Sequence, residues 1–396
     1  MRSALLQLQP LCTAHLKRRY SSRHFISSLF SRYSAKVNPP NPAKPAVDTA
    51  DSSQSVVGTV PYHTAYTLLR HPYQPSTYPA KLDNSFSPLG RRLMVQGTQK
   101  GEIVNFYWED EDPRVQSGDS PASGNKNRFP YITFAASASE GSPSKSSEEG
   151  DFLGRRPYYP IGVTIEQGNV SHDDSEIHKD STTTPQFPPN EAFLFVCTHA
   201  ARDCRCGDQG NAFVDALREE LNKRQHSTNL GKDELDKDQS EFVRGLEAVC
   251  EEFIGEGDAQ GEKKAREMLD AVWSRIRIGE VGHVGGHKYA ANLLAFPFGD
   301  WLGNLTPAHA PLVLDAIASR LLLLQMLESR KFDNRAGQSG SDVNGDGKVN
   351  VVEALSVPLI LDPTIWRGRM GLSKDEQTML FERYSRNAGD YTATTK

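Results

Sequence analysis

Apolar and polar positions divide the chain into two patterned regions that follow a polar N-terminal stretch. In the first region, residues 61–189, short apolar and aromatic runs predict strands. These runs are 104–108, 131–136 and 158–165. Polar, Gly/Ser-rich segments lie between and after them, and they bury too little apolar surface to offset the cost of ordering them. These segments are 116–126, 137–150 and 166–189. We therefore expect an α+β N-terminal region with disordered loop insertions.

From residue 190 onward, strand and helix patterns alternate. The apolar run 193–196 predicts a short buried strand, and apolar residues then recur at helical spacing over 211–225. The same criteria predict helices at 242–253 and 268–276, a strand at 275–282, a hairpin at 290–305 and a helix at 306–330. This order favours an α/β, thioredoxin-like domain over residues 190–332, with helices packed on a small mixed sheet. It is also compatible with other α/β sandwiches.

The C-terminal segment, residues 365–396, follows a polar insertion at 333–364. Ser373 and Glu376 form a capping-box pattern, which predicts a helix from this point. The sequence Trp-Arg-Gly-Arg at 366–369 precedes it. Two interpretations of that motif stay open: a packed anchor on the preceding domain, or a lid or docking point near a functional site of that domain.

The N-terminal 40 residues have the composition of a mitochondrial transit peptide. The formal net charge of −5 is unevenly spread, because residues 1–47 carry eight Lys and Arg and no Asp or Glu. Interleaved serines and an amphipathic apolar pattern complete that signature, although a basic tail that binds an anionic surface is the alternative. Residues 41–60, rich in Pro, Ala and Ser, predict a linker. The acidic remainder argues against a nucleic-acid partner.

Chemistry concentrates in two short segments. Three of the five cysteines, Cys197, Cys204 and Cys206, follow the apolar run 193–196 among charged residues, and an adjacent arginine favours the thiolate form. His283 and His287 flank a pair of glycines, which let the backbone approach a bulky object closely. Two thiols and two imidazoles complete a four-ligand site that suits zinc or one 2Fe–2S cluster.

These segments resemble the sucrase/ferredoxin-like family. The resemblance is carried by Cys-x-His-x-x-Arg-Asp-x-Arg-Cys-Gly at 197–207, His-Val-Gly-Gly-His-Lys-Tyr-Ala at 283–290 and Phe-Gly-Asp-Trp-Leu-Gly-Asn-Leu-Thr-Pro at 298–307. The Trp-Arg-Gly-Arg motif and the segments 78–79 and 104–108 resemble the mitochondrial branch, of the altered-inheritance-of-mitochondria type. The resemblance implies a thioredoxin-like ferredoxin domain with a 2Fe–2S cluster on Cys197, Cys206, His283 and His287. Cys204 occupies a variable position of the motif.

The function that follows is a mitochondrial electron carrier or redox protein, more an electron carrier than a stand-alone enzyme. Replacing two of four thiolates by imidazoles raises the reduction potential, and the second nitrogen of each imidazole allows proton-coupled electron transfer. The expected partners are a redox donor, an acceptor and the import machinery, with the matrix as the location. No apolar run reaches the roughly 18 residues that span a bilayer. The alternatives are a thiol–disulfide oxidoreductase that uses Cys204 and Cys206, and a zinc-stabilised binding module.

A second motif predicts a calcium site with much weaker support. Residues 342–353 fit the EF-hand loop template. The ligand positions of that template are Asp342, Asn344, Asp346, Lys348 and Glu353. No helical pattern precedes the loop, and Pro358 shortens any helix that follows. A solvated polar loop is therefore the competing interpretation.

Overall fold

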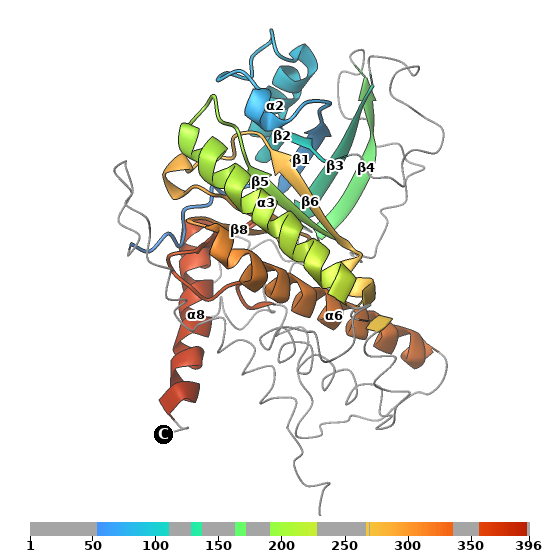
Figure 1. Cartoon of the computed structure of the whole chain (residues 1–396), viewed down its shortest axis with the longest axis vertical. Helices are drawn as coiled ribbons and strands as arrows, with labels where there is room; N and C mark the ends of the chain where they lie inside the picture. Colours follow the sequence, from blue (N-terminus) through green and yellow to red (C-terminus); the bar gives the residue numbers. More distant parts are fainter. Residues whose placement is uncertain are drawn as a thin grey trace, which may run out of the picture.

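The computed structural model describes residues 54–110, 128–136, 163–171, 191–227, 267–268, 270–335 and 356–393. Within these residues, nine strands form one mixed sheet in the order β4-β3-β1-β2-β6-β5-β7-β8-β9, with helices packed on it (Figure 1). The strands are β1 Ala65–Arg70, β2 Glu102–Trp108, β3 Arg128–Ala136, β4 Val163–Ser171, β5 Ala192–Cys197, β6 Ile276–Val281, β7 Leu293–Phe296, β8 Asp300–Leu302 and β9 Trp366–Arg369. The main helices are α2 Pro88–Lys100, α3 Cys204–Ser227, α6 Ala310–Arg335 and α8 Lys374–Ala393. The mixed α/β class predicted from the sequence is confirmed.

The sheet joins the regions that the sequence divides. β2 pairs antiparallel with β6 through Tyr107 opposite Val281, so the N-terminal strands continue directly into the central ones. β9 pairs antiparallel with β8, so the C-terminal segment also belongs to the sheet. The boundaries predicted near residues 189 and 365 are therefore no breaks in the sheet. The predicted boundaries rest on changes in composition, and composition carries no information on long-range strand pairing.

β5 lies near the middle of the sheet and is buried on both faces. Its residues alternate between two cores, because successive side chains of a strand point to opposite faces. Ala192, Leu194 and Val196 pack in a core with apolar residues of α3, α6 and α8. Phe193, Phe195 and Cys197 enter the other core, which the N-terminal strands also line. The continuous apolar run is typical of a doubly covered strand.

Several local predictions are confirmed. The predicted hairpin is the antiparallel pair β7 and β8. The capping box at the start of α8 is formed: Ser373 N–H donates to Glu376 Oε2 at 2.5 Å, and Glu376 N–H donates to Ser373 Oγ at 3.4 Å. Helices also form at 204–227 and 310–335, which overlap the predicted 211–225 and 306–330.

Other predictions are wrong in part. α3 begins at Cys204, so Cys204 and Cys206 lie in its first turn and not on a loop. β4 runs to Ser171 through residues expected as a loop insertion, because its pairing with β3 supplies hydrogen bonds that composition does not reveal. The predicted linker ends early: Val56 and Val60 are buried, and Val56 N–H donates to Pro363 O at 2.7 Å. Residues 56–60 therefore belong to the packed structure.

α6 is the most hydrophobic helix segment of the described residues that could match a membrane span by length. The window Pro307–Gln325 spans 19 residues with a mean hydropathy of 1.3, long and apolar enough by composition to cross a membrane. The sequence-based count of apolar runs missed it. In the structure, 61% of that window is buried, and Val313, Leu314 and Ile317 pack in the same core as α3. This is the environment of a core helix.

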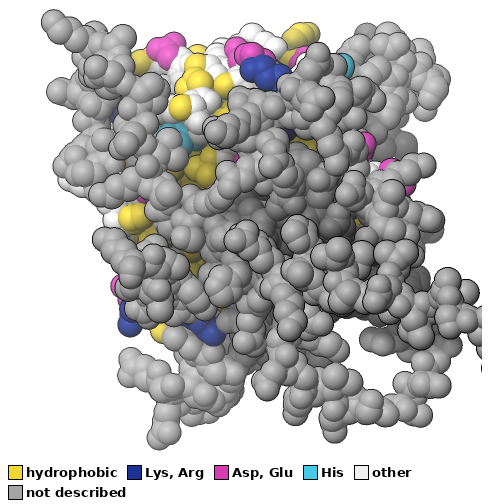
Figure 2. Space-filling model, turned by 60° about the horizontal axis from the view of Figure 1, so that its bottom comes forward, with side chains coloured by type: hydrophobic (Ala, Val, Ile, Leu, Met, Phe, Trp, Pro, Cys, Tyr) yellow, Lys and Arg dark blue, Asp and Glu magenta, His cyan; other side chains and the backbone are white. Residues whose placement is uncertain are grey.

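Large hydrophobic side chains are exposed at four separate points of the described residues. They are Tyr62, Tyr73, Val95 and Met379. At the upper edge of the face in Figure 2, hydrophobic side chains lie beside acidic and basic ones. Scattered exposure of this kind is normal for a protein surface and defines no docking face.

Several predictions lie outside the described residues. They are the transit peptide at 1–40, most of the linker, the helix at 242–253 and the EF-hand-like loop at 342–353 with Asp342, Asn344, Asp346, Lys348 and Glu353.

Candidate metal centre

Cys197 ends β5 and is fully buried. The first turns of α3 approach this strand end closely: a Cβ added at Gly210 would lie 2.2 Å from the Cys197 carbonyl oxygen. Only glycine permits that approach. It brings Cys206, 1% exposed, into the same core as Cys197.

Asp203 sets the start of α3. Its carboxylate accepts a hydrogen bond from Arg205 N–H at 3.0 Å, which is the role of an N-cap residue. The Arg205 guanidinium also donates to both carboxylate oxygens, at 3.0 and 2.9 Å. These bonds lower the pKa of Asp203 to about 2. The Cys-Arg-Cys sequence is thus folded as a capped helix start, with Cys206 directed inward and Cys204 exposed.

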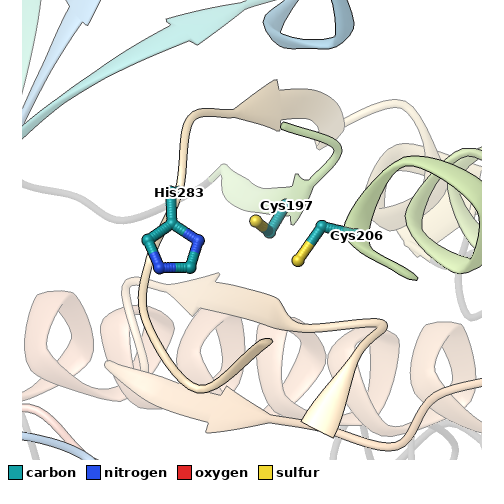
Figure 3. Close-up of side chains that lie close together, drawn as sticks. All are labelled: Cys197, Cys206 and His283. Carbon is teal, nitrogen blue, oxygen red and sulfur yellow. The ribbon is translucent and has the colours of Figure 1, made fainter. Parts of the chain in front are cut away.

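Three of the predicted ligands meet. The thiols of Cys197 and Cys206 and a ring nitrogen of His283 lie within 4.8 Å of one another. Figure 3 shows both sulfur atoms and the His283 ring converging from the end of β5, the start of α3 and the segment after β6. The hydrogen bond from the Cys206 thiol lowers the pKa of Cys197 well below its ordinary value, and the same contact raises the pKa of Cys206. The two thiols are therefore electrostatically coupled, and Cys197 is favoured to lose its proton before Cys206.

His283 is positioned by its backbone. Asn105 Nδ2 in β2 donates to the His283 carbonyl oxygen at 3.2 Å and to Tyr66 Oη at 3.1 Å. The His283 Nδ1 atom is buried and has no hydrogen-bond partner among the residues that the structure describes. A buried nitrogen without a partner beside two thiols is the environment that a metal ligand would have before it binds its metal.

His287 lies at the margin of the group. Its ring centroid is 5.7 Å from that of His283. Its Nε2 atom is 3.8 Å from Asp203 Oδ2, and its side chain is 47% exposed. The structure thus places the fourth predicted ligand next to the other three without bringing it into their closest set.

Hydrogen bonds from the C-terminal segment position the turn between His283 and His287. Arg367 Nη1 donates to the Gly285 carbonyl oxygen at 3.3 Å and to Asn292 Oδ1 at 2.7 Å. Asn292 Nδ2 in turn donates to the Gly286 carbonyl oxygen at 3.2 Å. Gly285 and Gly286 have positive φ angles of 83° and 67°, which only glycine adopts at low cost.

Two other residues of the cysteine motif pack into the fold. Thr198 Oγ1 donates to Glu280 Oε2 at 2.9 Å, and His199 Nε2 is 2.9 Å from the Pro79 carbonyl oxygen. Both side chains are buried. They tie the end of β5 to β6 and to the N-terminal region. Cys12 and Cys250 lie outside the described residues.

The residues fit a metal or a small iron–sulfur cluster. Two buried sulfurs with an unpartnered imidazole nitrogen form a soft donor set, and a second imidazole lies next to it. Such a set suits zinc in tetrahedral geometry, or a 2Fe–2S cluster with two ligands per iron. The geometry alone leaves both open.

The chain belongs to the sucrase/ferredoxin-like family, whose profile matches residues 58–327. Among curated proteins, it is 30% identical over 99 residues to "Altered inheritance of mitochondria protein 32" of Eremothecium gossypii, covering 21% of this chain and 31% of that protein. It is 27% identical over 128 residues to "Actin patches distal protein 1" of Saccharomyces cerevisiae, covering 31% of this chain and 28% of that protein. Each match thus spans less than a third of the relative. No solved structure matches the chain significantly.

Sequence reasoning missed residues that hold the candidate ligands in place. Asn105 and Asn292 lie in or next to apolar strands, and a buried polar residue in such a run was the available signal. Asp203 preceded a run that does not look helical, so its capping role was hidden. Arg367 gives no local signal beyond its place in the Trp-Arg-Gly-Arg motif.

Proposed function

We propose that this protein is a redox protein that carries one 2Fe–2S cluster on Cys197, Cys206, His283 and His287. The observation that carries the proposal is the convergence of two buried thiols and one imidazole nitrogen within 4.8 Å in a member of this family. His287 would complete the set, since its ring lies 5.7 Å from that of His283. The thioredoxin-like assignment is supported by the parallel pair β5 and β6 beside the antiparallel hairpin β7 and β8.

When bound, such a cluster supplies a one-electron redox couple, and imidazole ligands place its potential above that of a four-thiolate site. The chain contributes the surroundings. Burial of Cys197 and Cys206 excludes water from the sulfur side. A ligating imidazole keeps its second ring nitrogen for a proton. His287, 47% exposed and next to Asp203, is placed to exchange that proton with solvent. Proton coupling is therefore part of the proposal.

The helical start of α3 disfavours the thiol–disulfide alternative. Residues two apart on a helix do not face each other. Cys206 is buried against Cys197, whereas Cys204 is exposed. A Cys204–Cys206 disulfide would require this turn to unwind. The zinc-stabilised binding module needs the same donor set, so metal analysis must separate it from the cluster.

The cellular setting also belongs to the proposal. One relative is named for the inheritance of mitochondria, and the N-terminal composition has the character of a transit peptide. We place the protein in the mitochondrion, and more specifically in the matrix, where a donor and an acceptor protein would exchange electrons with it. Import machinery would be an earlier partner. The calcium site at 342–353 stays a separate, subordinate proposal.

The test is metal and sulfide analysis of protein purified without oxygen. We expect two iron atoms and two acid-labile sulfides per chain, with visible charge-transfer absorption that bleaches on reduction. One zinc per chain, with no sulfide and no colour, would instead establish the zinc module. A metal-free protein in which a Cys204–Cys206 disulfide forms reversibly would favour the oxidoreductase.

A further inference from the structure

Arg367 on β9 is a buried cation without an anionic side chain as its partner in the described part of the chain. Its side chain is 2% exposed. All of its hydrogen bonds go to neutral oxygens: Thr59 Oγ1 at 3.1 Å, Thr59 O at 3.2 Å, Gly285 O at 3.3 Å and Asn292 Oδ1 at 2.7 Å. A buried charge is costly unless it is paired, so this arrangement calls for a nearby negative group.

The second buried arginine of the same strand shows the contrast. Arg369 donates to both carboxylate oxygens of Asp300 at 3.0 Å and is equally enclosed. Its charge is therefore neutralised by a structural ion pair that ties β9 to β8. Arg367, two residues earlier, lies at the register shift between β8 and β9, and among the described residues its guanidinium finds only carbonyl, amide and hydroxyl oxygens as hydrogen-bond acceptors. β9 thus carries two buried cations, one paired with a carboxylate and one hydrogen-bonded only to neutral oxygens.

The position of Arg367 connects it to the candidate centre. Its guanidinium contacts the main chain of the Gly285–Gly286 turn between His283 and His287, and a Cβ added at Gly286 would lie 2.4 Å from Arg367 Nη2. It also lies over the Tyr289 and Trp301 rings, at 5.1 and 5.7 Å from their centroids. These rings exclude water from it and leave no access for a dissolved anionic substrate.

We propose that Arg367 is a positioning residue of the redox centre: it fixes the turn between the two histidines and supplies a buried positive charge beside that turn. This inference rests on the proposed function. It assigns a role to a residue outside the matched family region, residues 58–327. Burial lowers the pKa of Arg367 to about 10, and electrostatic interaction with Tyr289, and to a smaller extent with Cys197, partly offsets that effect.

The role has a definite electrostatic consequence. Reduction adds one negative charge to the centre, and a buried cation stabilises the more negative state. Removing the charge should therefore favour the oxidised state and lower the midpoint potential. Replacing Arg367 by Lys keeps the charge and should leave the midpoint potential nearly unchanged. It should destabilise the turn between His283 and His287, because a Lys ammonium cannot reproduce the planar donor pattern of Arg.

The experiment compares purified Arg367→Gln and Arg367→Lys with wild type by redox potentiometry and by the rate of cluster loss to an iron chelator. We expect Arg367→Gln to weaken reduction about tenfold, which for a one-electron couple corresponds to about 59 mV. Arg367→Lys should stay within about threefold of wild type in the reduction equilibrium and lose its cluster several-fold faster. Arg369→Lys, whose partner is Asp300, is the matched control and should change thermal unfolding and not the potential.

The possible outcomes distinguish a failure of this inference from a failure of the proposed 2Fe–2S function. Wild-type protein without iron and sulfide would overturn the proposed function itself. Wild-type protein with a cluster, together with an unshifted potential in Arg367→Gln, would overturn the role of Arg367 alone. If Arg367→Gln holds no cluster, the test rests on Arg367→Lys. A rate of cluster loss in Arg367→Lys equal to that of wild type would contradict the positioning role. An unfolded Arg367→Lys beside a folded Arg369→Lys would likewise show a role in the fold only.

Discussion

The candidate centre has an inner and an outer half that differ in burial. Cys197 and Cys206 are 0% and 1% exposed, and His283 presents a buried nitrogen to them. Cys204 is exposed, and His287 is 47% exposed beside Asp203. The two halves come from the same two motifs and carry the same residue types. Burial, not residue type, therefore distinguishes the three enclosed ligand candidates from His287, the proposed ligand placed to exchange a proton, and from the exposed Cys204.

The largest effect is expected in the inner half. Cys197→Ser should remove most of the iron and the visible absorption, because a neutral hydroxyl does not replace a buried thiolate as a soft ligand. Cys206→Ser should have the same effect. Iron and sulfide per chain are the measurements, with circular dichroism as the control for folding. Wild-type iron content in a folded Cys197→Ser protein would show that the buried inner half does not supply the essential ligands.

The midpoint potential of a His287 variant tests the role of the exposed outer half. His287→Cys, if it keeps the cluster, adds a thiolate charge and removes one titrating nitrogen. Its potential should be lower than that of wild type and depend less on pH. The wild-type potential should fall as pH rises, by up to about 59 mV per unit for one coupled proton.

Potentiometry over about three pH units checks this, with His283→Cys as the matched variant in the inner half. Because His287 is the more exposed ring, its replacement should remove more of the pH dependence. A flat wild-type potential would end the proton-coupling proposal, while equal slopes in both variants would show that exposure does not decide which ring exchanges the proton.

The ligand candidates could be predicted from the sequence because their chemistry is local. Cys197 follows a short apolar and aromatic run that favours a buried strand, and His283 and His287 flank a pair of glycines. The hairpin β7–β8 was equally predictable, since its turn residues and apolar runs lie within a few positions of each other. Local patterns of this kind are predictive because the structures they specify need no contact with a distant segment.

The rest depended on contacts between distant segments. The pairing of β2 with β6 joins residues more than 170 positions apart, and no local pattern encodes it. The start of α3 was hidden because Cys-Arg-Cys-Gly-Asp lacks helical apolar spacing, although Asp203 caps it. The contacts of Asn105 and Arg367 with the histidine segment arise only once the sheet brings three regions of the chain together.

Asp203 should have a moderate effect, on stability. Asp203→Ala removes the N-cap of α3 and should lower the free energy of unfolding by about 1 kcal/mol, whereas Asp203→Asn keeps a capping oxygen, loses the ion pair with Arg205 and should have an intermediate stability. Because the folded pKa of Asp203 is lowered to about 2 from 3.8, its contribution is present above pH 4 and lost as pH falls toward 2. Urea unfolding of the metal-free protein at pH 7 and pH 3 measures both. Equal stability of Asp203→Ala and wild type at pH 7 would contradict the capping role.

The smallest effect is expected for Cys204, the exposed cysteine of α3. Cys204→Ser should leave iron content, visible spectrum and midpoint potential unchanged within error. Its side chain points away from Cys206, because residues two apart on a helix do not share a face. Cys206→Ser is the matched variant, two positions along the same helical turn.

This null result distinguishes the cluster from a redox-active thiol pair. A thiol–disulfide oxidoreductase would lose its activity in Cys204→Ser as completely as in Cys206→Ser, since both sulfurs form the disulfide. A 2Fe–2S protein with the proposed ligands loses its colour only in Cys206→Ser. Colour lost in Cys204→Ser and kept in Cys206→Ser would transfer the second thiolate to Cys204, and the first turn of α3 would then have to rearrange around the cluster.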